Sequence, residues 1–392
     1  MTNSKQARVL TLMLLAASLT LAAVAQPGDK GTLIEFTAPG AATVTSAACG
    51  AYCGTFGYAN NNYGDIVGTY TDTNVIPHGF LRRADGKFVS FDAPGAGLGA
   101  GLDEGTAAIG INDLGEIAGQ YEDSNFVFHG FVRYIDGSFA TFEAPGAGTG
   151  PNQGTFAYDI NLEGETAGVY FDSNNVEHGF VRSPSGSIAT IDPTGSIGTM
   201  VCEETCLNLE GIITGFFLDA NNTFHGFVRQ PDGTITQLDA PGAGTGNYLG
   251  TVAASINPEG GITGYLVNSN SVAYGFVRTF DSFTTFEVPG ASTGAGQGTA
   301  AFSINLPGAV TGEFFDSNNA MHGFSRSARG AIATITAPGA GTGAGQGTRP
   351  STNNVEGVVT VRRCKQLESR LPVDSLADRV SRPVSAGTPL PR

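Results

Sequence analysis

The chain has 392 residues, a formal net charge of −15, 57 glycines, 14% charged residues and no tryptophan. Apolar residues make up 41%, enough to form a buried core, so the composition excludes a disordered low-complexity chain. Residues 31–348 hold 30 acidic and 9 basic side chains, a net charge of −21. A surface of that sign repels phosphate backbones, so we expect no nucleic-acid partner.

Residues 1–25 read as a signal peptide. Lys5 and Arg8 form a positive n-region, an apolar run follows to Val24, and Ala23-Val24-Ala25 is a small-residue cleavage site. The apolar run comes close to the length of a membrane anchor, but the cleavage site favours a signal peptide. No later segment is apolar enough to span a bilayer. We therefore expect a secreted or periplasmic protein without a membrane span, beginning at Gln26.

The next segment, Gly31–Gly40 (GTLIEFTAPG), matches only the last strand of a repeat that fills the chain after it. The repeat is marked by the tripeptide HGF at His78, His129, His178, His225 and His322, and by YGF at Tyr274. The second unit predicts four short strands at Thr106–Ile111, Glu116–Tyr121, Val127–Tyr134 and Ser138–Glu143, separated by turn sequences rich in Asn, Asp and Gly. Short connections favour antiparallel neighbours.

A four-stranded unit of about 48 residues is typical of a β-propeller blade. A β-solenoid is the alternative, although its coils are usually shorter and its strands parallel. After the sixth unit, Gly347–Val361 matches the first two strands of a seventh. Since the chain starts with a fourth strand, the N-terminal strand should complete the last blade and close the ring. We predict an all-β propeller domain over residues 26–361, with six complete blades and a composite seventh.

The repeat pattern stops at Arg362, and residues 362–392 are predicted to form an irregular C-terminal tail. The motif INxxGxIxG followed by HGF resembles the extracellular HAF-repeat proteins of bacteria. Ile111-Asn112, Gly115, Ile117, Gly119 and His129-Gly130-Phe131 carry this resemblance, with Gly where the family's name motif has Ala. The resemblance implies an exported repeat protein and assigns no biochemical role.

The histidines that open the HGF motif are interpreted as structural, because a packing solution is needed in every blade and an active site only once. Five of them follow an aspartate by six residues, and the unit with Tyr274 has Asn268 in place of the aspartate. Facing positions across a short hairpin predict an Asp–His contact. The pairs are Asp72 with His78, Asp123 with His129, Asp172 with His178, Asp219 with His225, and Asp316 with His322.

The arginine that follows each HGF motif is predicted to make hydrogen bonds between strands or blades. The Asp loops offer oxygen ligands suited to calcium, but none has the D-x-D-x-D-G pattern. We therefore expect no cofactor, with calcium as the alternative. These loops and the Gly-rich linkers should share one face of the propeller, the default surface for a ligand.

The fourth unit departs from the repeat and suggests a candidate asymmetric site. Cys202 and Cys206 are expected on its first strand beside the central channel, with Glu203 and Glu204 between them. In an extended strand the two cysteines lie roughly 13 Å apart, too far for a direct disulfide.

Two functions follow from this pattern. The first is a non-enzymatic binding or surface-structural role with an extracellular glycan, peptide or protein partner. The alternative is a secreted lyase or glycosidase that uses carboxylates near the channel. The repeat symmetry favours the first.

Overall fold

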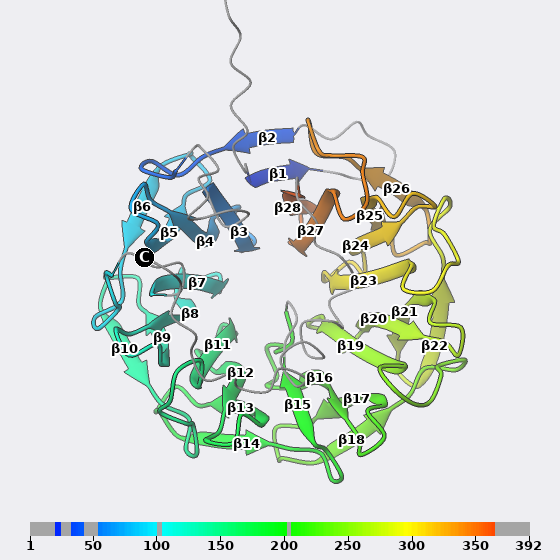
Figure 1. Ribbon diagram of the computed structural model, residues 1–392, viewed down its shortest axis with the longest axis horizontal. Helices are drawn as coiled ribbons and strands as arrows, with labels where there is room; N and C mark the ends of the chain where they lie inside the picture. Colours follow the sequence, from blue (N-terminus) through cyan, green and yellow to red (C-terminus); the bar gives the residue numbers. More distant parts are fainter. Residues whose placement is uncertain (1–19, 25–32, 43–53, 100–103, 202–204, 365–392) are drawn as a thin grey trace, which may run out of the picture.

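The computed structural model describes residues 20–24, 33–42, 54–99, 104–201 and 205–364. These residues contain 28 strands, arranged in groups of four around a central channel (Figure 1). The groups form seven blades, which confirms the predicted all-β propeller with six complete repeats and a composite seventh blade. The described part of the chain holds no helix with the length and hydropathy needed to span a bilayer.

The first three blades follow one another along the chain. In each, the first strand faces the channel and the fourth lies at the rim (Figure 1). Blade 1 consists of β3 (Gly54–Asn60), β4 (Ile66–Thr71), β5 (Pro77–Arg82) and β6 (Phe88–Phe91). Blade 2 consists of β7 (Gly105–Ile111), β8 (Ile117–Glu122), β9 (Phe128–Arg133) and β10 (Phe139–Phe142). Blade 3 consists of β11 (Gly154–Ile160), β12 (Thr166–Phe171), β13 (Glu177–Arg182) and β14 (Ile188–Ile191).

The next three blades repeat this order. Blade 4 consists of β15 (Gly198–Val201), β16 (Ile213–Leu218), β17 (Phe224–Arg229) and β18 (Ile235–Leu238). Blade 5 consists of β19 (Gly250–Ile256), β20 (Ile262–Val267), β21 (Ala273–Thr279) and β22 (Ser282–Phe286). Blade 6 consists of β23 (Gly298–Ile304), β24 (Val310–Phe315), β25 (Met321–Arg326) and β26 (Ile332–Ile335).

Blade 7 is built from both ends of the chain. It consists of β27 (Gly347–Asn353), β28 (Val358–Cys364), β1 (Thr20–Val24) and β2 (Leu33–Phe36). The predicted N-terminal strand is β2, and it takes the fourth position as expected. The third position is taken by β1, which pairs with β28 on one side and β2 on the other. Sequence analysis did not predict this strand, because residues 20–24 lie inside the predicted signal peptide.

The second boundary also differs from the prediction. β28 continues to Cys364, whereas the tail was expected to begin at Arg362. Arg362 pairs in register with Arg349 of β27 and Thr20 of β1. The repeat motif ends before the strand does, because ladder pairing needs only a backbone that can donate and accept hydrogen bonds. The rest of the tail, residues 365–392, lies outside the described residues, as do residues 1–19.

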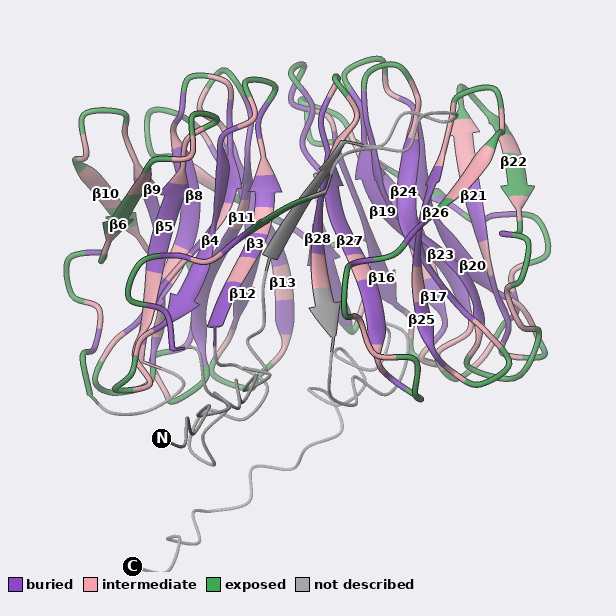
Figure 2. Cartoon of the chain, turned by 90° about the horizontal axis from the view of Figure 1, so that it is seen from above, coloured by how far each residue is buried: buried purple, intermediate pink, exposed green. Residues whose placement is uncertain are grey.

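The core of blades 1 to 6 is organised by the phenylalanine of the HGF or YGF motif and by a glycine in the second strand. Phe131 is fully buried, and an added Cβ on Gly119 would lie 2.2 Å from the Ala107 carbonyl oxygen and 2.6 Å from the Phe131 ring. The first strand bulges between Ala108 and Gly110, which brings its backbone against the second strand. Only glycine fits such a close approach. Figure 2 shows that burial is concentrated in the strands.

Four of the six arginines that follow the HGF and YGF motifs join neighbouring blades. The Arg133 guanidinium lies 4.7 Å from the centre of the Phe91 ring, which belongs to the fourth strand of the preceding blade. The same cation–π contact links Arg82 to Phe36, Arg182 to Phe142 and Arg326 to Phe286. Stacking against the preceding blade is therefore the contact that these four arginines share.

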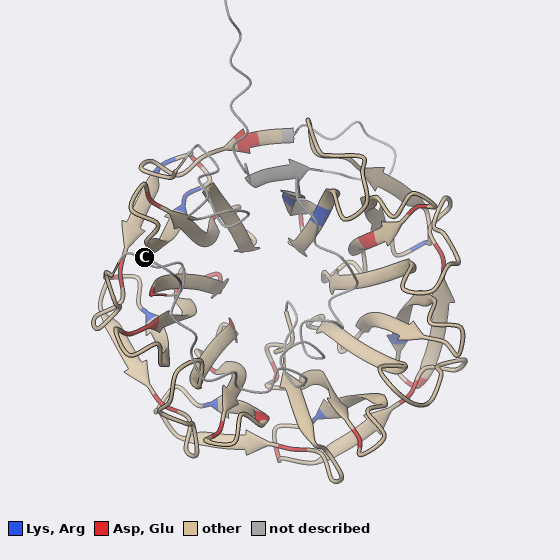
Figure 3. Ribbon diagram, viewed as in Figure 1, with Lys and Arg blue, Asp and Glu red and all other residues tan. Residues whose placement is uncertain are grey.

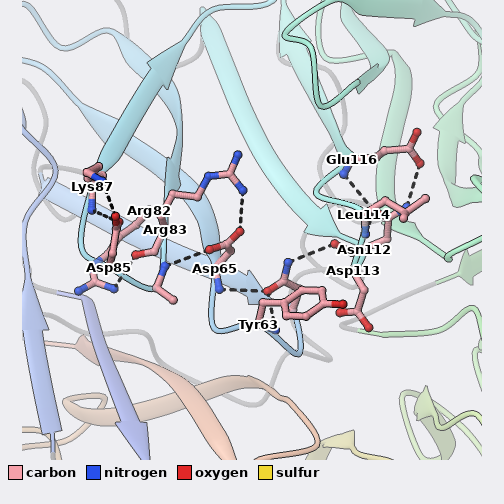
Figure 4. Close-up of polar contacts among 12 residues, drawn as sticks. Tyr63, Asp65, Arg82, Arg83, Asp85, Lys87, Asn112, Asp113, Leu114 and Glu116 are labelled. Atoms are coloured by element: carbon pink, nitrogen blue, oxygen red, sulfur yellow. Dashed lines mark hydrogen bonds and ion pairs between the residues drawn. The ribbon is translucent and has the colours of Figure 1, made fainter.

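A ring of asparagines joins the inner turns of the blades. Asn112 sits in the turn between β7 and β8, and its Nδ2 donates to the Asn161 carbonyl of blade 3 at 2.9 Å. The side-chain oxygen of Asn112 accepts the backbone N–H groups of Leu114 and Glu116, which fixes the turn (Figure 4). Six of the seven possible hydrogen bonds from an Asn Nδ2 to the carbonyl of the next ring asparagine are made. They run from Asn61 to Asn112, Asn112 to Asn161, Asn161 to Asn208, Asn257 to Asn305, Asn305 to Asn354 and Asn354 to Asn61.

The seventh link is missing in blade 4. Asn208 has the position of the other ring asparagines, but its Nδ2 is buried and has no hydrogen-bond partner among the described residues. The inner ring is thus regular on blades 5, 6, 7, 1, 2 and 3 and interrupted where blade 4 meets blade 5.

Candidate functional site

Five of the predicted histidines lie near the same end of their blades, each at the second residue of a third strand. Across the antiparallel ladder each pairs with an aromatic residue of the second strand, as Tyr121 does with His129. The two rings stack with centroids 4.7 Å apart and planes inclined by 19°. Equivalent contacts at 4.9 to 5.2 Å join Tyr70 to His78, Tyr170 to His178, Phe217 to His225 and Phe314 to His322.

Each of the first four histidines also contacts an acid that sequence analysis did not single out. The Nδ1 of His78 lies 2.8 Å from Asp92, and that of His178 lies 2.8 Å from Asp192. His129 contacts Glu143 in the same way, and His225 lies 3.0 Å from Asp239. The acid is always 14 residues after the histidine, directly before the linker. That fixed spacing was the sequence signal that could have found it.

The predicted aspartate partner lies on the other ring nitrogen. The distance from Nε2 to the aspartate Oδ2 is 3.7 Å for Asp72, 3.5 Å for Asp123, 3.8 Å for Asp172 and 3.6 Å for Asp219. Asp316 alone comes within 3.0 Å of its histidine, His322. Blade 6 has Thr336 where the other blades carry the second acid. A histidine thus lies between two carboxylates in blades 1 to 4 and beside one in blade 6.

The aspartates also hold the hairpin loop between the second and third strands. The Oδ1 of Asp123 accepts the backbone N–H groups of Asn125 and Val127, and its Oδ2 accepts the Asn125 side chain. Partial burial raises the pKa of Asp123, but these hydrogen bonds and the one from His129 outweigh it, so the pKa is lowered overall. The same balance lowers the pKa of the aspartates at 72, 172, 219 and 316.

The hairpin aspartate has two roles, holding the loop and contacting the histidine, and blade 5 shows that the first does not need a carboxylate. Asn268 replaces the aspartate, and its side-chain oxygen still accepts the backbone N–H groups of Asn270 and Val272. An amide oxygen therefore suffices to hold the loop, and a carboxylate is not required for it. The negative charge is present in the five units that have histidine and absent in the unit that has Tyr274. The negative charge of the hairpin position and the histidine therefore occur together.

These five groups, each with an aromatic ring, a histidine and one or two carboxylates, are called the histidine clusters. They are partly open to solvent: the His78 side chain is 16% exposed and that of Asp92 is 40% exposed. The linkers approach the same end of the blades, because the Gly148 N–H donates to the Phe171 carbonyl at the end of β12. Figure 3 marks the positions of the acidic residues, which occur in all parts of the ring.

The predicted asymmetric site is only partly described. Cys202, Glu203 and Glu204 lie outside the described residues. Cys206 is fully buried and disulfide-bonded. The expectation that it lies on the first strand is wrong, because β15 ends at Val201 and Cys206 follows in a loop. The argument that an extended strand prevents a disulfide therefore does not apply to this segment.

The loop around Cys206 is held by Asp159 of blade 3, a residue that sequence analysis missed. The Asp159 Oδ2 accepts the backbone N–H groups of Cys206 at 2.8 Å and Leu207 at 3.0 Å. Its Oδ1 accepts the N–H of Ile160 at 2.9 Å. Burial raises the pKa of Asp159 to about 6, against the lowering effect of these three N–H groups.

Among the described residues, no group of three or more His, Cys, Asp or Glu side chains is arranged to hold a metal ion. The aspartates at 72, 123, 172 and 219 already use both oxygens within their own loops, and Asp316 uses Oδ1 in its loop and Oδ2 for His322. The expectation of no cofactor, with calcium at these loops as the alternative, stays a prediction.

No family model and no curated protein matches the chain, so the resemblance to HAF-repeat proteins also stays a prediction. Solved structures similar to this chain are β-propeller proteins. The propeller domain of the Trilobed protease from Pyrococcus furiosus has a TM-score of 0.51 and 11% identity, covering 80% of this chain and 93% of that one. This likeness shows the fold alone.

Two further structures are similar at lower scores. The BP39L lectin from Burkholderia pseudomallei has a TM-score of 0.49 and 9% identity, covering 81% of this chain and 98% of that one. A streptogramin B lyase has a TM-score of 0.48 and 11% identity, covering 84% and 98%. One of these two structures is a lectin and the other a lyase, and the structural similarity assigns neither activity to this chain.

Proposed function

We propose that this protein is an exported, non-enzymatic binding protein that contacts an extracellular glycan, peptide or protein through its histidine clusters. The observation that carries the proposal is repetition: a partly exposed imidazole with one or two carboxylates, stacked on a buried aromatic ring, occurs at the same end of five blades. A catalytic group is needed once, whereas a multivalent binding surface gains avidity from each added copy.

The chemistry of the clusters also suits binding. Their carboxylates have free lone pairs beyond those used by histidine, because Glu143 is 49% exposed and Asp239 is 45% exposed. The buried ring holds the imidazole in place, so each cluster presents a partly exposed imidazole and carboxylate in a fixed arrangement, as ligand sites with a few placed polar groups do. Because the chain is strongly acidic, it favours neutral or basic ligands over anionic ones.

A screen of glycans and peptides against residues 26–392 would identify the ligand, and titration calorimetry would then count its sites. Replacing one exposed acid, as in Glu143→Gln, should lower the number of sites by one and leave the affinity of the others unchanged. Tyr274→Ala in blade 5 is the matched control and should leave the number unchanged.

A single binding site that none of the cluster substitutions weakens would overturn the proposal. Conversion of the bound ligand into a product would favour the enzyme alternative.

A further inference from the structure

Each joint between neighbouring blades brings two first strands together, and the joints that follow blades 5, 6 and 7 share one rule. A residue at the bulge of the first strand carries a hydroxyl, which accepts one backbone N–H from the next blade. Ser255 accepts the N–H of Ile304 at 3.3 Å, and Ser303 accepts the N–H of Asn353 at 3.3 Å. Thr352 accepts the N–H of Asn60 at 3.2 Å, which joins blade 7 to blade 1. These joints are neutral.

The joint between blades 3 and 4 breaks this rule. The bulge of β11 falls between Ala157 and Asp159, so Asp159 has the position that Ser255 and Ser303 have in blades 5 and 6. It accepts two N–H groups from blade 4 in place of one, because Cys206 presents a second donor. The chain therefore has one carboxylate where the equivalent contacts use hydroxyl groups.

We propose that the joint between blades 3 and 4 is proton-sensitive: one proton taken up by Asp159 favours the closed joint, so the joint opens more often at neutral pH than in mild acid.

The physical reason is the cost of a buried charge. Asp159 is 8% exposed, and the three groups that face its oxygens are backbone N–H donors rather than cations. Such donors offset only part of the penalty of removing a carboxylate from water. Local opening of the joint returns the carboxylate to solvent and so relieves this penalty. Protonation removes the charge, and with it the penalty, while the joint stays closed.

Protonation is compatible with the closed geometry. A proton on Oδ1 displaces only the local contact with Ile160 and leaves both inter-blade bonds to Oδ2 in place. The pKa of Asp159, raised by burial, agrees with this preference for the neutral acid. No charged side chain of the described residues is among the causes of that shift.

The elements packed against Asp159 bring no other group that titrates between pH 5 and 8 within the described residues. The neighbouring strand of blade 2 approaches with Gly110, which has no side chain. From blade 4 the facing residues are Leu207 and Cys206, and the Cys206 sulfur does not titrate because it is part of a disulfide. Its own strand contributes Tyr158, whose phenol ordinarily ionises near pH 10.

Amide hydrogen exchange of residues 26–392 at about pH 5 and about pH 7.5, corrected for intrinsic rates, tests the proposal. With a pKa near 6 in the closed state and the ordinary value of 3.8 in the open state, protection of the Cys206 and Leu207 amides should be about tenfold higher in acid. The Ile304 amide at the Ser255 joint is the internal control and should show no such change.

Asp159→Ser gives this joint the hydroxyl that the joints after blades 5, 6 and 7 use, so protection at Leu207 should become independent of pH. Asp159→Asn is the second variant, and unchanged protection at Ile304 shows that either variant is folded. Equal protection at both pH values in the original chain, or the same pH response after Asp159→Ser, would overturn the proposal.

Discussion

Replacing His129 by alanine should test how the histidine clusters are held together. The change removes the contact of Nδ1 with Glu143 and the stacking on Tyr121 at 4.7 Å. A hydrogen bond contributes about 1 kcal/mol and an aromatic pair about 0.5–1.5 kcal/mol. We therefore expect His129→Ala to lower the free energy of unfolding by about 2 kcal/mol, measured by urea denaturation.

Double-mutant cycles should then rank the two acids. Glu143→Gln should couple to His129→Ala by about 1 kcal/mol, because the two side chains are in direct contact. Asp123→Asn should couple by less than about 0.5 kcal/mol, because its Oδ2 lies 3.5 Å from Nε2 and the asparagine keeps the loop contacts, as Asn268 does in blade 5. Asp192→Asn, in the neighbouring blade, is the control and should be additive.

The opposite ranking would refute the assignment of Glu143 as the principal partner of His129. Strong coupling to Asp123 together with additivity at Glu143 would place the main contact in the hairpin loop. It would also mean that the recurring acid before the linker does not belong to the clusters.

Two further predictions concern pH and processing. The hydrogen bond with Asp92 raises the pKa of His78 above the ordinary histidine value of 6.5. Its contribution to stability is therefore complete below pH 6.5 and is lost as the pH rises through the higher folded pKa. An NMR titration should place the His78 midpoint above 6.5, and Asp92→Asn should lower it. N-terminal sequencing of the exported protein should give Gln26. A chain that begins there lacks β1, so amides of Val358–Arg362 should exchange faster in it than in residues 1–392; equal exchange would show that β1 does not cover β28.

The fold could be predicted from the sequence because each level of pattern agrees with the others. Alternating strands, turn residues and a fixed repeat specify the blades, and the incomplete units at both ends predict the closure of the ring. β1 could not be predicted in the same way. Residues 20–24 carry an export pattern and no repeat motif, so nothing local distinguishes this strand from the rest of the apolar run.

The candidate site could be predicted only where its members lie close in sequence. Asp123 and His129 flank one hairpin, so their proximity follows from the turn. Glu143 is brought to His129 by the pairing of the third and fourth strands, and Asp159 is brought to Cys206 by the packing of two blades. Contacts of that kind depend on register and blade geometry, which no local pattern reveals.

A substitution in the asparagine ring and one in a histidine cluster differ in the number of blades that they affect. Six of the seven asparagines of the inner ring are bonded to the next blade, so a change at one of them affects two blades at once. The histidine clusters are formed within single blades, and they vary without disturbing their neighbours: Phe217 replaces tyrosine in blade 4, and Tyr274 replaces histidine in blade 5.

Substitutions can therefore change the histidine clusters blade by blade, which the proposed multivalent binding requires. The inner ring tolerates a departure only where new contacts replace the old ones. Blade 4 shows this, because Asp159 and Thr205 join its irregular loop to blades 3 and 5 where Asn208 has lost its link. A function that needs a single site should accordingly be sought at blade 4, and one that needs several equivalent sites should be sought at the histidine clusters.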